Sequence, residues 1–396
     1  MDRIGPSELN YAIRVLEGQF SNSGYQGMAE RLERAFSSLM DRKYSVSFCN
    51  GTATMHSALE VCGVGPGDEV IVPALTMSAT TLSVLHAGAT PVFADVDFDT
   101  LQISPESVAA ARTANTRAVI PVALYGGSPD YNALLPVCEG LDIIEDNAEA
   151  VGSTYDGRPL GSFGRFASYS LQSSKHLTSG EGGLVTTDDE HDADALRRFQ
   201  SLGYANVSSR SAKISRDVLQ SPTFQRHASI GWNYRLGEVL AAVALAQVER
   251  ADDLIEARTQ AGDLYARAAS GFPWIRPQVN PPNSIHSYWT WSAVLDEDAG
   301  SWHDFRQAFI AAGGDPIYAT WLPAYLEPMF TERRLGPRIE HLRLERLRQY
   351  GPGLCPTAER LQPRILQFTT NHYDRRESER QAAILHDTLN NWEKKL

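Results

Sequence analysis

Short apolar, β-branched runs recur through the first half of the chain, and each is followed by polar or turn residues. Such runs are typical of strands buried on both faces of a parallel sheet. Helical patterns, such as those at residues 52–62 and 79–86, lie between most of them. We therefore expect an α/β fold with a largely parallel sheet covered by helices on both faces. The expected strands lie at residues 46–48, 69–72, 91–94, 118–122, 143–146, 166–170 and 183–187.

The pattern changes after the last of these runs. Residues 236–266 form a long Ala- and Glu-rich helical pattern, which predicts one continuous helix leading into a second domain. A chain of 396 residues also exceeds what one core comfortably holds. We expect an N-terminal segment with a large ligand-binding domain over residues 1–250, and a smaller α+β domain over residues 251–396.

Two charged residues stand where such a sheet binds ligands. Asp146 closes an expected strand, and Lys175 lies in a Ser- and Gly-rich loop after the next one. Ligands of open α/β sheets sit outside the carboxyl ends of the strands. An aldehyde cofactor such as pyridoxal phosphate (PLP) needs an amine to hold it as a Schiff base and a carboxylate against its ring nitrogen. Taken singly, Lys175 could be a solvated loop lysine and Asp146 a helix cap.

A third feature is the segment Phe48-Cys49-Asn50-Gly51-Thr52, a strand that leads through a glycine turn into a helix. Backbone N–H groups at a helix start, together with the Thr52 hydroxyl, can bind phosphate. An ordinary strand–turn–helix junction capped by Thr52 is the alternative. The segment lacks the lysine of a P-loop and the third glycine of a dinucleotide fingerprint, so neither ATP nor NAD is the expected ligand.

Several motifs in the same order resemble the DegT/StrS-type sugar aminotransferases, a branch of the fold type I PLP enzymes. They are Gly51-Thr52-Ala53, residues 67–74, 87–93 and 124–126, Glu145-Asp146-Asn147-Ala148-Glu149-Ala150, the lysine segment and Gly231-Trp232-Asn233-Tyr234-Arg235-Leu236. The resemblance implies a PLP-dependent transaminase with a large PLP domain and a smaller C-terminal domain. The amino group would pass from glutamate or glutamine to a keto sugar, most simply a nucleotide-linked keto-deoxysugar.

The resemblance also implies roles for individual residues. Lys175 and Asp146 are the expected catalytic pair. The phosphate of the cofactor would be bound by Gly51, Thr52, Ala53 and Ser170 of one subunit and by Asn233 of its neighbour. A residue that reaches across in this way implies a homodimer with shared active sites.

Some positions depart from the family pattern. Met77 stands where an aromatic residue usually stacks on the cofactor ring, and a thioether can still cover a ring face. Gln172 stands where the family often has His, and Glu149 stands where it often has Gln or His. Both would still lie beside the cofactor. Tyr318 and Trp321 occupy a region whose usual signature is lost, and they are candidate substrate residues with Glu149 and His176. The alternative for His176 is a packed histidine, and for the aromatic residues it is a place in the core.

Three other functions compete with a sugar aminotransferase. An aminocyclitol precursor such as an inosose is the closest rival acceptor. The family also contains sugar dehydratases, in which histidine replaces the lysine, and Lys175 argues against that activity. A non-catalytic regulatory homologue is the last alternative, although Thr52, Asp146, Ser170, Lys175 and Asn233 are all present.

The net charge and the cysteines limit which binding partners and which cellular compartment we expect. The formal net charge of −12 argues against a nucleic-acid or anionic membrane surface. The four cysteines form no CxxC pair and no metal-ligand spacing, so we expect free thiols and no metal site. No export signal opens the chain and no apolar stretch is long enough for a membrane span, so we expect a cytoplasmic protein.

Overall fold

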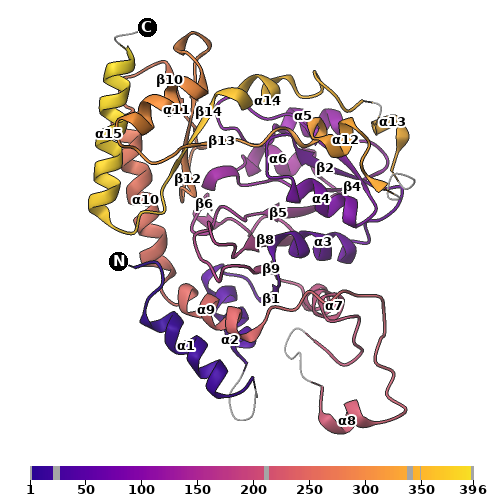
Figure 1. Ribbon diagram of the computed structural model, residues 1–396. Coiled ribbons are helices and arrows are strands. Elements are labelled where there is room, and N and C mark those ends of the chain that lie inside the picture. The colour runs from indigo at the N-terminus through magenta and orange to yellow at the C-terminus, as the bar shows by residue number, and fades with distance from the viewer. Residues whose placement is uncertain (1, 21–26, 209–213, 337–341, 348, 394–396) are drawn as a thin grey trace.

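The computed structural model describes residues 2–20, 27–208, 214–336, 342–347 and 349–393. A large α/β domain with a central sheet occupies one end of the molecule, and a smaller sheet flanked by long helices occupies the other (Figure 1). This architecture confirms the α/β class and the smaller C-terminal α+β part expected from the sequence. The division at residue 250 itself remains a prediction.

The central sheet has seven strands in the order β1-β9-β8-β5-β4-β2-β3. Pairing is parallel except at β9, which runs antiparallel to both β1 and β8. The largely parallel sheet is thus confirmed, with one reversed strand inserted. The strands are β1 (Tyr44–Phe48), β2 (Glu69–Pro73), β3 (Thr90–Ala94), β4 (Thr116–Val119), β5 (Asp142–Asp146), β8 (Phe166–Ser170) and β9 (Gly183–Thr187).

Helices cover both faces of this sheet. Val70 and Val72 of β2 pack into the core on one face, whereas Ile71 packs into the core on the other. A strand buried on both faces needs a continuous apolar run, which explains why these strands do not alternate. On the first face lie α3 (Gly51–Val61) and α4 (Ala79–His86), with α7 (Glu190–Gln200) beside α3. The other face carries α5 (Pro105–Ala111), α6 (Tyr131–Val137), α2 (Met28–Leu39) and α9 (Glu238–Val248), with α1 (Pro6–Glu17) against α9.

The smaller part is built on an antiparallel sheet with the order β10-β12-β14-β13. Its apolar core lies between that sheet and three helices, α10 (Ala251–Ala268), α11 (Trp302–Ala311) and α15 (Arg375–Glu393). The strands are β10 (Ile275–Pro277), β12 (Thr290–Leu295), β13 (Tyr318–Ala319) and β14 (Ile365–Thr369). A three-stranded sheet pairs β11 (Ser284–Ile285) with β6 (Thr154–Tyr155), and β6 with β7 (Arg158–Pro159).

Residues between β13 and β14 return to the large domain. Tyr325 and Phe330 from this stretch pack against Phe93 of β3, with ring centroids 5.0 and 6.0 Å away. The stretch contains α12 (Pro328–Thr331), α13 (Leu344–Leu347) and α14 (Pro356–Leu361). The two ends of the molecule are therefore joined by packing as well as by α10.

The prediction of one continuous helix over residues 236–266 is wrong. The structure has two helices, α9 and α10, which are separated at Glu249 and Arg250. Arg250 has φ −127° and ψ 29°, outside the helical region. Its side chain binds Glu8 of α1 and the backbone of the N-terminal segment. Side-chain periodicity does not report these contacts of Arg250, because its partners lie at the other end of the chain.

Within the described ranges, no helix combines the length and the apolar composition that crossing a membrane requires. The longest helices, α10 and α15, carry charged residues along their length. Both instead bury one side in the core of the smaller part.

Candidate active site

Asp146 is a buried carboxylate at the carboxyl end of β5. Its side chain is 4% exposed. Its Oδ2 accepts a hydrogen bond from the Thr80 hydroxyl at 2.9 Å, and its Oδ1 accepts one from the Ala148 backbone N–H at 3.2 Å. Burial raises the pKa of Asp146, and the neighbouring Glu149 raises it further, while these hydrogen bonds and Lys175 oppose the shift. A buried carboxylate of this kind gains most from a positively charged partner.

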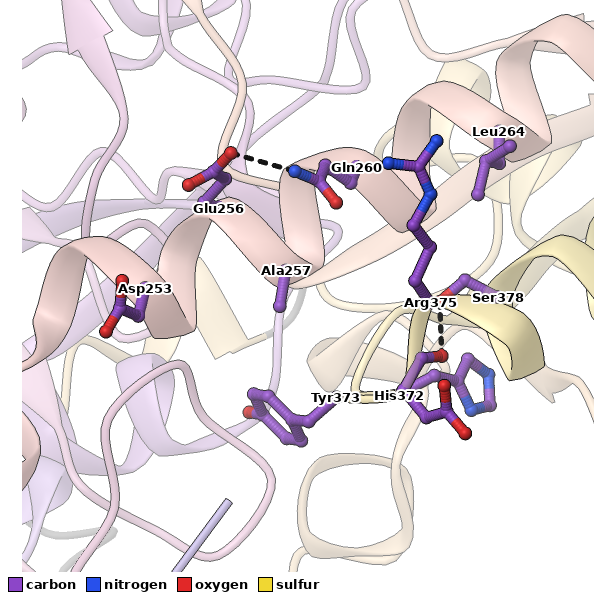
Figure 2. A pocket seen from close by; sticks show the side chains of 10 residues that line it. Asp253, Glu256, Ala257, Gln260, Leu264, His372, Tyr373, Arg375 and Ser378 are labelled. Atoms are coloured by element: carbon purple, nitrogen blue, oxygen red, sulfur yellow. Dashed lines mark hydrogen bonds between the residues drawn. The ribbon is translucent and has the colours of Figure 1, made fainter. Parts of the chain in front are cut away.

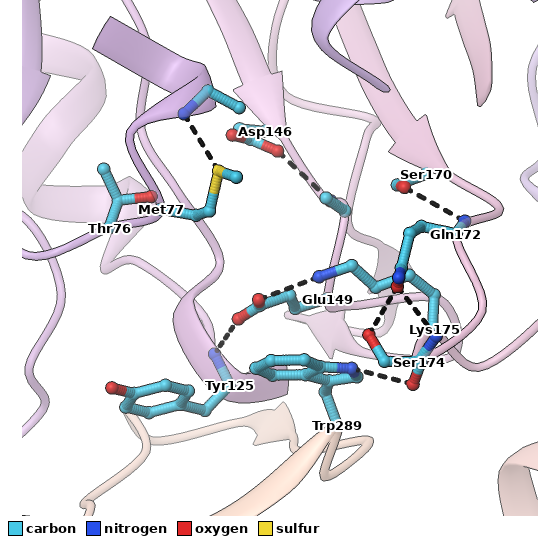
Figure 3. A network of polar contacts seen from close by, with 12 residues as sticks. Thr76, Met77, Tyr125, Asp146, Glu149, Ser170, Gln172, Ser174, Lys175 and Trp289 are labelled. Carbon is cyan, nitrogen blue, oxygen red and sulfur yellow. Dashed lines mark hydrogen bonds and ion pairs between the residues drawn. The ribbon is translucent and has the colours of Figure 1, made fainter. Parts of the chain in front are cut away.

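Lys175 follows β8, and its side chain points toward Glu149 (Figure 3). Its Nζ lies 2.9 Å from Oε1 of Glu149 and 4.1 Å from the centroid of the Trp289 ring. The side chains of Lys175 and Glu149 are only 14% and 6% exposed. The lysine therefore lies in an enclosed site, against an acid and an aromatic face, which excludes the solvated loop lysine.

Tyr125 fixes the other oxygen of Glu149. The Tyr125 backbone N–H donates to Glu149 Oε2 at 3.0 Å. Tyr125 has φ 64°, a left-handed conformation that is strained for a bulky residue. Its hydroxyl donates to Thr320 Oγ1 at 2.5 Å, which holds the residue from its far end. Strain at this position is typical of a functional site, and here it aims an N–H group at the carboxylate.

Aromatic rings form one wall beside Lys175. The rings of Tyr125, Trp289 and Trp321 lie nearly parallel, with centroids 6.1 to 6.4 Å apart. Trp289 donates its Nε1–H to the Ser174 carbonyl at 3.0 Å. A cavity of about 300 Å³ adjoins these rings, and Tyr318, which is 60% exposed, also lines it. Its other lining residues are Ser174, Arg258, Thr290, Ala319, Gln367, Thr369 and Asn371.

The glycine turn before α3 adjoins the end of β8. A Cβ on Gly51 would lie 3.1 Å from the Cβ of Ser170, so the turn and Ser170 are in close approach. The helix is capped by Asn50, whose Oδ1 accepts from the Ala53 backbone N–H at 2.8 Å. Thr52 is therefore not the N-cap, and the capping alternative of the sequence analysis is wrong for that residue. The Asn50 side chain adopts this position because its backbone is extended there.

Two further residues expected beside the cofactor make local contacts. Met77 is 48% exposed, and its sulfur accepts from the Ala79 backbone N–H at 3.0 Å. Gln172 turns back on its own loop, where its Oε1 accepts from the Ser174 N–H and hydroxyl, both at 2.7 Å. Gln172 thus shapes the turn that leads to Lys175.

His176 and Asn233 differ most from the rest of the expected set. His176 is 1% exposed, its Nε2 lies 3.0 Å from the Ser287 carbonyl, and burial lowers its pKa well below the usual range. This geometry favours the packed histidine over a substrate residue. Asn233 is exposed, and the next residue, Tyr234, accepts a hydrogen bond from the Cys49 N–H at 2.8 Å. The segment that contains Asn233 therefore passes beside the glycine turn before α3 of its own subunit.

One group within the described residues has the spacing of a metal site. Ligand atoms of Asp315, His372 and Glu377 lie within 4.8 Å of one another. Glu377, however, already accepts two hydrogen bonds from Arg380, at 2.9 and 2.6 Å. A guanidinium next to the carboxylate opposes a second cation there, so this group does not make a convincing metal site.

The residues at the ends of β5 and β8 fit PLP. The cofactor carries a phosphate, a basic ring nitrogen and an aldehyde. The structure offers a helix N-terminus with Ser170 in close approach, a buried carboxylate on Asp146 and an enclosed amine on Lys175. These three partners match the three groups in kind.

Sequence reasoning did not assign several residues of this site. Thr80 and Tyr125 hold the two carboxylates, and Arg258 contacts the lysine loop. Tyr125 belongs to the motif Leu124-Tyr125-Gly126, which could have marked it, whereas Thr80 and Arg258 lie in ordinary helical patterns.

Solved structures share this architecture. The aminotransferase from Psychrobacter cryohalolentis superposes with a TM-score of 0.86 at 26% identity, covering 98% of this chain and 98% of that one. S. venezuelae DesV, solved in complex with a ketimine intermediate, gives a TM-score of 0.81 at 27% identity, covering 96% of this chain and 94% of that one. The fold type I aminotransferase architecture is thereby confirmed.

Curated relatives agree with these structures. GDP-perosamine synthase from Vibrio cholerae is 31% identical over 303 residues, covering 76% of this chain and 78% of that protein. The spore coat polysaccharide biosynthesis protein SpsC from Bacillus subtilis (strain 168) is 34% identical over 296 residues, 74% of each chain. The model of the DegT/DnrJ/EryC1/StrS aminotransferase family matches residues 2–341. The chain therefore belongs to the DegT/DnrJ/EryC1/StrS aminotransferase family and is a PLP-dependent transaminase.

Proposed function

We propose that this enzyme transfers an amino group from glutamate or glutamine to the keto group of a nucleotide-linked keto-deoxysugar. The observation that carries the proposal is the enclosed triplet Asp146, Glu149 and Lys175 at the carboxyl ends of β5 and β8. Relatives named GDP-perosamine synthase, from Vibrio cholerae and Caulobacter vibrioides, support a sugar nucleotide as the acceptor.

Lys175 and Asp146 are the catalytic residues of the proposal. When bound, PLP accepts the amino group at its aldehyde carbon and withdraws electrons from the reacting carbon of the substrate. The Lys175 amine would then be free to move a proton between that carbon and the cofactor. Asp146 would keep a proton on the ring nitrogen, since its buried carboxylate is stabilised by a cation in contact. Glu149 Oε1 lies 2.9 Å from Lys175 Nζ and would receive the ammonium when the lysine does not hold the cofactor.

The remaining cofactor contacts are inferred from the residues at the start of α3 and beside it. Gly51, Thr52 and Ala53 open α3, and Ser170 lies in close approach to Gly51, so these residues would bind the phosphate. The Ala53 N–H would exchange its bond to Asn50 for one to the phosphate. Met77 would cover one face of the ring, and Gln172 would hold the lysine loop in its turn.

The acceptor would bind against the aromatic wall. Trp289 presents its ring face to Lys175 and lies nearly parallel to Trp321. Both rings line a cavity of about 300 Å³, a size that small-molecule sites use. The C–H face of a sugar ring suits such a wall, while its hydroxyls suit Glu149, which accepts hydrogen bonds.

A homodimer is proposed from the surface of the subunit. The outer side of α1 exposes Leu9, Ile13 and Leu16 at 60%, 48% and 54%, and Ile230 and Trp232 beside Asn233 are 88% and 48% exposed. Apolar groups of this size are usually covered in an assembly. Lys175→Ala and Asn233→Asp subunits, each poorly active alone, should regain part of the activity when mixed, because one site of a heterodimer is complete. No recovery under demonstrated subunit exchange would place Asn233 outside the neighbour's site.

The free cysteine thiols support our proposal of a cytoplasmic location. Cys49, Cys62, Cys138 and Cys355 are all free in the structure, as expected in a reducing compartment. Formation of a disulfide in the protein isolated directly from cells would contradict it.

The test of the whole proposal has two parts. Borohydride reduction of the purified enzyme should fix the cofactor on Lys175, and a cofactor adduct on another lysine would overturn the assignment. The enzyme is then loaded with amino groups from glutamate or glutamine and offered keto nucleotide sugars, inososes and 2-keto acids, with products read by mass spectrometry. Amination of 2-keto acids alone would leave a general amino-acid transaminase, and amination of an inosose alone would identify the rival acceptor.

A further inference from the structure

Two guanidinium groups converge on the backbone carbonyl of Lys175. Arg3 donates to this oxygen at 2.7 Å, and Arg258 of α10 donates to it at 3.0 Å. Arg258 also donates to the preceding carbonyl, that of Ser174, at 2.8 Å. We propose that Arg3 and Arg258 are positioning residues of the transamination site, which clamp the backbone of Lys175 and make the N-terminal segment part of the active site.

Arg258 is buried without a carboxylate among its contacts in the described part of the chain. It is 1% exposed, and its hydrogen bonds go to the carbonyls of Ser174, Lys175 and Trp289 and to the Thr370 hydroxyl. Burial lowers the pKa of Arg258; Tyr373 opposes this shift, and the charge of Arg3 adds to it. A buried charge without a counter-ion is unfavourable for folding. Its presence under the lysine loop is therefore better explained by what it holds than by stability.

Tyr373 lies between the two arginines. Its ring centroid is 5.8 Å from the guanidinium carbon of Arg3 and 5.9 Å from that of Arg258. Figure 2 shows Tyr373 directly beside Ala257, the neighbour of Arg258 in α10. The ring face offsets part of the charge of both groups while leaving their N–H groups available for the Lys175 carbonyl.

The N-terminal segment is anchored, so Arg3 approaches Lys175 from a fixed point. The Arg3 carbonyl accepts from Gln247 Nε2 at 2.8 Å and from Arg250. Glu8, which is 1% exposed, accepts from Arg250 Nε at 2.8 Å and from the Gly5 N–H at 2.9 Å. Burial raises the pKa of Glu8, but its hydrogen bonds lower it more, so the net shift is downward and the carboxylate stays charged. This network ties residues 2–8 to the junction of α9 and α10.

The clamp acts on the reaction through Lys175, and the inference rests on the proposed role of that lysine. Lys175 Nζ must reach the cofactor, the substrate carbon and Glu149 in turn, so the base of its side chain has to stay fixed. A displacement of about 1 Å at a reacting group can reduce the rate roughly 10²-fold. Loss of the clamp should therefore lower kcat and leave the binding of the amino donor almost unchanged.

The experiment compares Arg3→Ala, Arg258→Lys and Arg112→Ala. Arg3 is a partly exposed residue near the terminus, so its replacement preserves the core. Arg258→Lys keeps the positive charge but loses the planar guanidinium, whose several N–H groups can donate to more than one carbonyl. Arg112 is the matched control, because it donates to the carbonyls of Val137 and Glu139 at 3.1 and 2.7 Å and contacts no residue of the site.

Two measurements are made on each variant. Hydrogen exchange of the cofactor-free protein follows the amides of Ser174 and Lys175, which donate to Gln172 at 2.7 and 2.9 Å. In Arg3→Ala these amides should exchange at least about tenfold faster, and kcat should fall about 10- to 10²-fold with KM for glutamate within about twofold. Arg258→Lys should give the same pattern, and Arg112→Ala should resemble the unaltered enzyme in both measurements.

Unchanged exchange and unchanged kcat in Arg3→Ala would overturn the clamp. Faster exchange with unchanged kcat would also overturn it, because the contact would then be structural only. A raised KM at constant kcat would assign Arg3 to substrate binding instead. Borohydride labelling separates this failure from failure of the proposed function, since a label on Lys175 upholds the function whatever the clamp does.

Discussion

Lys175 Nζ and Glu149 Oε1 lie 2.9 Å apart in an enclosed site. The ion pair is held from the Glu149 side by the Tyr125 N–H and from the Lys175 side by the face of Trp289. A buried pair is stable only when its remaining polar positions are satisfied, and here the strained backbone of Tyr125 does this. The pair gives the lysine a defined place in the cofactor-free fold.

Glu149→Gln should slow amino transfer while preserving the fold. Glutamine retains an oxygen for the Tyr125 N–H, but it loses the charge that faces Lys175. A hydrogen bond to a charged group contributes about 1.5–3 kcal/mol, which corresponds to a factor of roughly 10 to 10² in rate. Single-turnover kinetics with glutamate measure the effect, and Glu139→Gln, at an exposed site, is the control. An unaltered rate would show that Glu149 does not receive the lysine.

Asp146→Asn should lower the catalytic rate while raising the stability of the cofactor-free fold. Burial raises the pKa of Asp146, so its ionised form is unfavourable in the cofactor-free fold at neutral pH. Asparagine removes that charge and can keep the bond from the Ala148 N–H. We expect a higher melting temperature without cofactor, together with a loss of roughly a thousandfold or more in kcat. Near-normal turnover, measured with saturating PLP, would leave Asp146 a structural role only.

The sheet and its two charged residues could be predicted from the sequence because they depend on local patterns. A strand buried on both faces produces an apolar run, and β2, β3, β5, β8 and β9 each begin or end within two residues of the expected positions. Asp146 closes such a run, and that alone sets its place at the edge of the sheet. The reversed direction of β9 could not be inferred, since apolar runs carry no information about strand direction.

The contacts that hold the site could not be predicted from the sequence. Tyr125 has a left-handed backbone, which is uncommon for a bulky residue and is not marked by its local sequence. Arg3 contacts Lys175 from 172 positions away, and Arg250, at the break between α9 and α10, contacts Glu8 of the same N-terminal segment. Neither a propensity nor a period reports such distant contacts, because both describe only neighbouring residues.

Trp321→Leu should weaken binding of the acceptor and leave binding of the amino donor unchanged. The Trp321 ring lies parallel to Trp289 beside the cavity, where a sugar ring would stack. An aromatic contact of this kind contributes about 0.5–1.5 kcal/mol, so KM for the acceptor should rise about two- to tenfold with KM for glutamate unchanged. Trp302→Leu on α11 is the control, because that ring packs against the core of the smaller part. Equal changes in both KM values would argue for a general disturbance of the site.

The fold should lose stability in mild acid through two buried histidines. Burial lowers the pKa of His176, and it lowers the pKa of His286 from 6.5 to about 3. Below pH 6.5 the unfolded chain binds protons on both rings while the folded chain does not. The free energy of unfolding therefore falls as the pH drops below 6.5, by up to about 1.4 kcal/mol per pH unit for each ring, and for His286 the loss continues to about pH 3.

His286→Asn tests this pH dependence. Asparagine can still accept the hydrogen bond that the Tyr288 N–H makes to His286 Nδ1 at 2.9 Å, but it does not titrate. Denaturant unfolding between pH 5 and pH 7 should give a shallower slope for the variant, and the comparison cancels the contribution of every group the two proteins share. His303→Asn, at an exposed position on α11, is the matched histidine substitution for comparison. Equal slopes for His286→Asn and the unaltered enzyme would mean that His286 is protonated inside the fold, against the burial seen here.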